Sequence, residues 1–130
     1  MSIGKKVLIG VFALMFIGGG IAHFLNPEFY FQLMHYIIPA GHGELKEQLI
    51  YISGATEILA GLLFILPQTR RWGAIFIMLH LIVFLPIHVT MCFTTKPTPP
   101  WYAVWARLII QFALIYWAAT FTQKPVNQTK

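Results

Sequence analysis

The chain has 130 residues, of which 58% are hydrophobic and only 10% are charged, whereas a soluble domain carries charge on about a quarter of its residues. These few charged side chains cannot cover a surface in water, so the composition excludes an ordinary soluble domain. The formal net charge of +5 does not indicate nucleic-acid binding, because the basic residues occur singly or in pairs between apolar stretches.

Four apolar stretches are each close to the roughly 20 residues that a helix needs to cross a bilayer, and they predict four transmembrane helices. The first, about residues 7–25, follows Lys5 and Lys6 and ends at Asn26 and Pro27, a pair that stops a helix. A signal peptide also begins with basic residues, but no clean cleavage site follows this long stretch, so a retained span is favoured.

The segment from Glu28 to Gln48 combines several aromatic residues with Glu44, Lys46 and Glu47 and also contains a proline and two glycines. This mixture predicts an interfacial half-helix followed by a turn. The second span, about residues 49–66, ends just before a very short connection. Helices two and three are therefore expected to be antiparallel neighbours.

The third span, about residues 72–93, contains Pro86, which should free a backbone carbonyl one turn earlier and kink the helix. A proline-rich loop over residues 96–100 precedes the fourth span, about residues 101–121, and a polar tail. The sequence thus predicts an all-α membrane protein, a single domain over residues 1–130. Its fold is an antiparallel four-transmembrane-helix bundle with a short interfacial segment between helices one and two.

The lysines and arginines outside the spans predict the orientation of this bundle. Six of the eight lie on the side of the two termini, and two lie on the other side: Lys5, Lys6, Arg70, Arg71, Lys124 and Lys130 against Lys46 and Lys96. The positive-inside rule therefore predicts that both termini are cytoplasmic.

Several ionisable residues lie within the predicted spans, where each costs about 2.5 to 3.5 kcal/mol to insert. At a rise of about 1.5 Å per residue, Glu57 lies about 13 Å from the outer end of its helix, Arg107 about 9 Å, His88 about 7 Å and His23 within about 3 Å. These four can meet in the outer half of the bundle. His80, about 19 Å from its outer end, is expected below them as a hydrogen-bonded packing histidine.

Helical spacing extends this candidate cluster. Ser53, Glu57 and Gly61 share one face, and the glycine permits close helix approach. Gln111 lies one turn from Arg107 on the fourth span. A Glu57–Arg107 ion pair is predicted, since it would remove most of the insertion cost and leave guanidinium donors for a ligand. The alternative is that the pair is only a structural lock between two helices. The candidate site comprises Glu57, Arg107, Gln111, His88, Ser53 and His23.

Other chemistries have weaker support in the sequence. Cys92 is the single cysteine, which excludes an internal disulfide and a CxxC redox couple. His88, Met91 and Cys92 could offer nitrogen and sulfur to copper, but three residues on one helix are a weak signal and no metal site is predicted. No phosphate-binding loop, nucleophile elbow or paired carboxylates occur, so catalytic activity of the chain on its own is not expected.

Four short runs carry a family resemblance: His23-Phe24, Ile52 to Ile58 with Pro67 to Arg70, Val83 to Pro86, and Ala106 to Leu108 with Gln111. In order and spacing they resemble the DoxX-like family of small bacterial membrane proteins from His23 to Trp117. The resemblance implies a four-helix bundle in the bacterial cytoplasmic (inner) membrane, grouped with redox-associated proteins that include a subunit of a quinone-linked oxidoreductase. The chain departs from the family pattern Phe-Pro-Ala-Asn at Leu85 to His88, and it lacks the cysteine pair of thiol-redox relatives.

Two functional hypotheses follow. The first is an accessory or small-molecule-binding membrane protein whose polar cluster holds a quinone-like molecule, because an arginine can donate to a quinone carbonyl and a carboxylate or histidine can exchange the accompanying proton. The alternative is a structural or assembly partner of a larger membrane complex, with no site of its own. A transporter is disfavoured, because four short helices show no inverted repeat.

Overall fold

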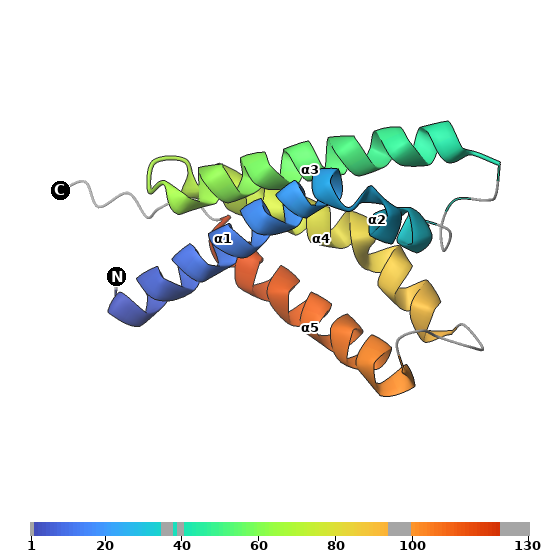
Figure 1. Ribbon diagram of the computed structural model, residues 1–130. Helices are drawn as coiled ribbons and strands as arrows, with labels where there is room; N and C mark the ends of the chain where they lie inside the picture. The colour runs from blue at the N-terminus through green and yellow to red at the C-terminus, as the bar shows by residue number, and fades with distance from the viewer. Residues whose placement is uncertain (1, 35–37, 39–40, 94–99, 123–130) are drawn as a thin grey trace.

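The computed structural model describes residues 2–34, 38, 41–93 and 100–122, and the regular elements within them are all α-helices. Five helices follow one another within the described residues (Figure 1): α1 (Ile3–Leu25), α2 (Pro27–Met34), α3 (Gly43–Ile65), α4 (Arg70–Cys92) and α5 (Trp101–Ala119).

Four of these helices, all except α2, are long and apolar enough to cross a membrane. Three contain 23 residues and α5 contains 19, so at about 1.5 Å per residue they match the roughly 30 Å hydrocarbon core of a bilayer. Large apolar side chains such as Leu14, Val83 and Ile109 are exposed on their outer surfaces, where lipid would surround them. The protein is therefore a small multi-pass integral membrane protein, and the predicted all-α four-span bundle is confirmed.

Three of the four spans, α1, α3 and α4, begin earlier than the apolar stretches that predicted them, whereas α5 begins at the predicted residue. α3 begins at Gly43 rather than near residue 49, so the charged residues Glu44, Lys46 and Glu47 lie in its first turns and not in the predicted turn. Hydropathy detects only the part of a helix that is suited to hydrocarbon. Glutamate and lysine are nevertheless good helix formers, and a glutamate in the first turn interacts favourably with the helix dipole.

The other boundaries differ less. α1 begins at Ile3, where the side chain of Ser2 accepts a hydrogen bond of 3.2 Å from the backbone N–H of Lys5. The predicted half-helix is present as α2, which starts at Pro27 because proline suits the first position of a helix. Much of the turn after α2, the proline-rich loop and most of the polar tail lie outside the described residues.

α1 and α3 are antiparallel and pack through small residues. A Cβ built on Gly20 would lie 2.6 Å from the carbonyl oxygen of Gly54, and one on Gly61 would lie 2.8 Å from the carbonyl oxygen of Ala13. No side chain fits at such distances, so the two backbones are in direct contact, as small residues permit between membrane helices. The close approach predicted at Gly61 is confirmed.

One end of the bundle, which we call the closed end, joins the start of α1, the α3–α4 connection and the end of α5. The rings of Phe12 and Trp117 lie 4.7 Å apart, and the ammonium of Lys5 lies 5.0 Å from the centre of the Phe121 ring. Nε of Arg71 donates a hydrogen bond of 2.6 Å to the carbonyl of Thr122. Lys5, Arg71 and the end of α5 therefore lie on the same side of the molecule.

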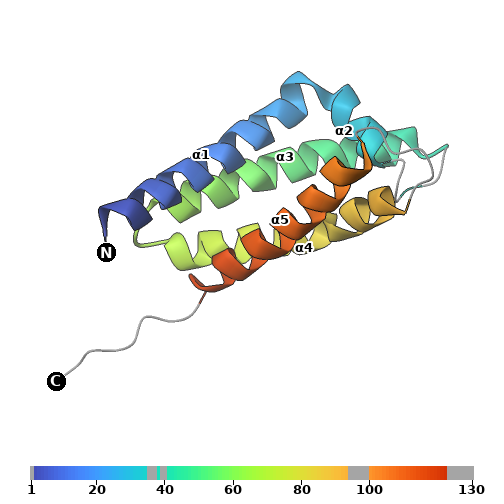
Figure 2. The same ribbon diagram turned by 90° about the horizontal axis from the view of Figure 1, so that it is seen from below.

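The opposite end, which we call the open end, is less tightly packed. In Figure 1 the end of α5 lies near α1, and the two helices separate toward the start of α5. The turned view in Figure 2 shows α1 beside α3 and α5 beside α4. The bundle thus consists of two helix pairs that are joined along α3 and α4, with α2 folded against α3 at the open end.

Candidate functional site

The open end holds a cavity of about 250 Å³, here called the polar cavity, lined by residues of all five helices. Phe16, Leu33, Phe84 and other apolar residues form part of its wall. Its polar residues are His23, Glu57, His80, His88, Arg107 and Gln111, together with Tyr30. Pockets for drug-sized ligands measure about 300–1,000 Å³, so this cavity suits a compact molecule or the head group of a longer one.

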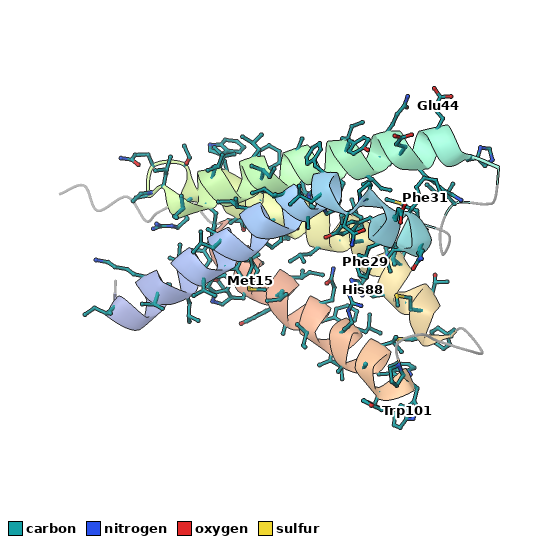
Figure 3. All side chains as sticks on the ribbon, in the orientation of Figure 1. Met15, Phe29, Phe31, Glu44, His88 and Trp101 are labelled. Carbon is teal, nitrogen blue, oxygen red and sulfur yellow. The ribbon has the colours of Figure 1, made fainter. Side chains whose placement is uncertain are left out.

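Five of the six predicted site residues line the polar cavity: His23, Glu57, His88, Arg107 and Gln111. Figure 3 labels His88 on α4 and Phe29 on α2, and both residues line this cavity. Ser53, the sixth, is hydrogen-bonded to this group and lines a second, mostly apolar cavity of about 340 Å³ between α3 and α4. The structure therefore brings the predicted residues together.

His23 is the most tightly held residue of the cluster, with only 4% of its surface exposed. Its Nδ1 lies 2.7 Å from the carbonyl oxygen of Gly19. Because a carbonyl can only accept, Nδ1 carries the proton and Nε2 of the neutral ring is an acceptor. The Tyr30 ring stacks on the imidazole at 3.7 Å between centroids and 17° between planes. The break between α1 and α2 turns the chain so that Tyr30 covers the histidine.

Glu57 pairs with His23 and not, as predicted, with Arg107. One carboxylate oxygen lies 3.5 Å from Nδ1 of His23, and this is the one ion pair that Glu57 forms within the described residues. The prediction of a Glu57–Arg107 pair is therefore wrong. Glu57 and Arg107 do not pair because of the arrangement of the helices, since α5 packs on α4 while α3 packs on α1. Glutamate and arginine consequently lie on different helix pairs and face the same cavity.

His80 belongs to the cluster rather than lying below it, which corrects the depth predicted for it. Its Nε2 lies 3.2 Å from the hydroxyl of Ser53, so the expected hydrogen-bonded histidine is present. The short α3–α4 connection places the backbone of Gly73 against that of Phe64. Counting two turns from this contact along both helices brings His80 level with Glu57.

Gln111 contacts α4 close to Pro86, which lies inside this helix. Its amide nitrogen donates a hydrogen bond of 2.7 Å to the carbonyl of Leu81, next to the Ile82 carbonyl that loses its helical donor because Pro86 has no N–H. This contact joins α5 to α4 at the cavity. His88 lies one turn further along α4, half-buried in the cavity wall. Arg107 is exposed, and within the described residues it forms no hydrogen bond or ion pair.

Two residues of the site were not predicted from the sequence. Tyr30 lies in the segment predicted to be an interfacial half-helix, and the break between α1 and α2 separates it from His23, seven residues earlier. Gly19 lies so close to Glu57 that a Cβ there would be 2.7 Å from the carboxylate. The run of three glycines at residues 18–20 is the signal that could have indicated this close approach.

The electrostatics of α2 also bear on the site. Burial, and after it the negative charge of Glu57, raise the pKa of the Tyr30 phenol above its ordinary value of 10.0. The phenol is therefore a neutral donor at physiological pH, and its hydroxyl points at the carbonyl of Gly19 at 3.5 Å.

In the described part of the chain, no group of three or more His, Cys, Asp or Glu side chains is arranged to hold a metal ion.

Fold and site together define a small multi-pass membrane protein with a polar cavity between two helix pairs. The chain belongs to a family described as a domain of unknown function (DUF8561), whose model matches residues 12–122 and so includes every residue that lines the cavity. No curated protein and no solved structure matches the chain.

Proposed function

We propose that this protein binds a compact amphipathic molecule, of the quinone type, in the polar cavity and acts as an accessory protein in membrane redox processes. The observation that carries the proposal is that Glu57 and Arg107 line one cavity without pairing with each other. An unpaired cation in a membrane helix is costly and is functional by default. A carbonyl oxygen between these side chains would give the guanidinium an acceptor.

The shape of the cavity supports the same class of ligand. Aromatic side chains such as Phe16, Phe29 and Phe84 form part of the wall, and they suit a flat ring. A volume of about 250 Å³ holds a ring but not an isoprenoid tail. The tail of a membrane quinone would therefore have to leave the cavity toward the lipid.

The proposal extends to location. The resemblance to DoxX-like proteins supports a bacterial cytoplasmic membrane, and the basic residues at the closed end, among them Lys5 and Arg71, support cytoplasmic termini. The accessory role rests on the same resemblance.

Equilibrium binding of short-chain quinones to the purified protein tests the proposal. Arg107→Gln should weaken binding about 10- to 100-fold, since a hydrogen bond to a charged group contributes about 1.5–3 kcal/mol. Arg107→Lys should recover part of this loss, because a lysine keeps the charge but not the planar fork.

A matched control separates the cavity from general effects on the bundle. Thr56→Val changes the second cavity, and Thr56 does not line the polar cavity, so quinone affinity should stay within about twofold of that of the unaltered protein. Absence of quinone binding by the unaltered protein would defeat the proposal and leave the assembly partner as the better explanation.

A further inference from the structure

Four polar side chains from three helices form one continuous chain of contacts at the edge of the polar cavity. A carboxylate oxygen of Glu57 lies 3.5 Å from Nδ1 of His23. Nε2 of His23 lies 3.5 Å from the hydroxyl of Ser53, and that hydroxyl lies 3.2 Å from Nε2 of His80. Three of the four, Glu57, His23 and His80, line the polar cavity.

A single hydroxyl thus lies between two imidazole nitrogens. Ser53 has one proton to donate, and it can accept as well. Since the Nδ1 proton of His23 faces the Gly19 carbonyl, Nε2 of neutral His23 can only accept. Both contacts of Ser53 can therefore be hydrogen bonds in only two arrangements. In the first, Ser53 donates to neutral His23 and accepts from a protonated Nε2 of His80. In the second, charged His23 donates from Nε2 to Ser53, and Ser53 donates to Nε2 of His80.

We propose that Ser53 relays a proton between His23 and His80, so that the α1–α3 wall and the α4 wall of the polar cavity share one proton. In the transfer, the Nε2–H bond of charged His23 breaks and an O–H bond forms on Ser53. The original Ser53 O–H bond breaks as its proton passes to Nε2 of His80. The positive charge moves from one ring to the other, and no other reactant is needed.

The surroundings favour one shared proton over two. Glu57 lies beside Nδ1 of His23 and stabilises a charge on that ring. From the other elements, Tyr30 of α2 covers His23 as a neutral group, while His88 of α4 and Arg107 of α5 face the same cavity. The fixed charge of Arg107 and the closeness of the two rings disfavour a second positive charge.

The relay does not depend on the ligand, so its test uses the protein without one. Ring ¹⁵N NMR of histidine-labelled protein in lipid nanodiscs, titrated from about pH 5 to 8 around the ordinary histidine pKa, reports the tautomer and the midpoint of each ring. Signals are assigned by single histidine replacements. The unaltered protein should show neutral His23 protonated on Nδ1, and His80→Gln should shift the His23 midpoint by about one pH unit.

Ser53→Ala should abolish this dependence of His23 on His80, and Ser53→Thr, which keeps the hydroxyl, should preserve it. Thr56→Val is the matched control, because the Thr56 hydroxyl donates to the backbone carbonyl of Ser53 and forms no hydrogen bond with the Ser53 hydroxyl or with either ring. A His23 ring protonated on Nε2 in its neutral form would overturn the relay even if every variant failed to fold. Equal coupling in the Ser53→Ala protein would also overturn it. Loss of quinone binding with this coupling intact would count against the proposed function alone.

Discussion

The Nδ1 atom of His23 lies 3.5 Å from the Glu57 carboxylate, and the two side chains are only 6% and 16% exposed. Glu57 therefore depends on His23 for its ion pair, whereas His23 also contacts the Gly19 carbonyl and the Ser53 hydroxyl. Glu57→Gln and His23→Asn should each lower the free energy of unfolding by about 1–3 kcal/mol, the cost of an unsatisfied buried polar group. The double variant should lose less than the sum, because contacting residues are coupled. Unfolding in detergent micelles measures all three.

Arg107 provides a comparison for these single and double variants of Glu57 and His23. Because it does not pair with Glu57, Arg107→Gln combined with Glu57→Gln should be additive within about 0.5 kcal/mol. Coupling of Glu57 to Arg107 without coupling to His23 would contradict the contacts described above and favour the pair predicted from the sequence.

Two neighbouring glycines of α1 should respond differently to the same substitution. A Cβ at Gly19 would lie 2.7 Å from a Glu57 carboxylate oxygen, whereas one at Gly18 meets nothing within 4 Å. Gly19→Ala should therefore displace the carboxylate and lower the free energy of unfolding by about 1 kcal/mol, with the loss recovered in a Glu57→Ala background. Gly18→Ala should be neutral or should stabilise by up to about 1 kcal/mol, because alanine is the better helix former. Equal effects at the two positions in thermal unfolding would show that Glu57 does not lie against Gly19.

The raised pKa of Tyr30 predicts that the free energy of unfolding falls at alkaline pH. Its pKa is raised in the folded protein, by burial first and by Glu57 second, so the unfolded chain releases this proton at a lower pH than the folded protein does. The contribution is fully present below about pH 10, the ordinary tyrosine pKa, and is lost as the pH rises toward the raised value. Tyr30→Phe should reduce this alkaline loss in unfolding measured from about pH 8 to 11. Phe29→Leu on the same helix removes no ionisable group and should retain it.

The topology can be tested with single cysteines in a Cys92→Ser background. Gln68 lies in the α3–α4 connection and His42 precedes α3 at the other end, and both are exposed. Gln68→Cys should react with a membrane-impermeant thiol reagent only from the cytoplasmic side and His42→Cys only from the opposite side. Reporter fusions at Lys130 and Lys96 should likewise give opposite readouts. Identical labelling of the two cysteines would exclude the four-span arrangement.

The sequence predicted the spans and the gathering of polar residues because both follow from hydropathy and from distance along single helices. Glu57, Arg107 and His88 could be placed at similar depth in this way. Which side chains touch depends on which helices are neighbours, and hydropathy carries no such information. The prediction that Arg107 pairs with Glu57 was wrong for that reason. The predicted depth of His80 was also wrong, because the contact between Gly73 and Phe64, and not the outer end of α4, determines its level in the bundle.

His88 distinguishes a binding site from a scaffold. It is half-buried in the wall of the polar cavity, and Glu57 pairs with His23, so no ion pair requires it. His88→Asn keeps a hydrogen-bonding side chain but removes an ionisable imidazole. The free energy of unfolding should therefore change by less than about 0.5 kcal/mol, as for a surface substitution. The pH dependence of quinone affinity, measured from about pH 5.5 to 8 where an unperturbed histidine changes charge, should change by more than twofold across that range. His88→Leu, which cannot hydrogen-bond, separates the loss of titration from the loss of polarity. An unchanged pH profile in both variants would remove His88 from the site and leave it a wall residue.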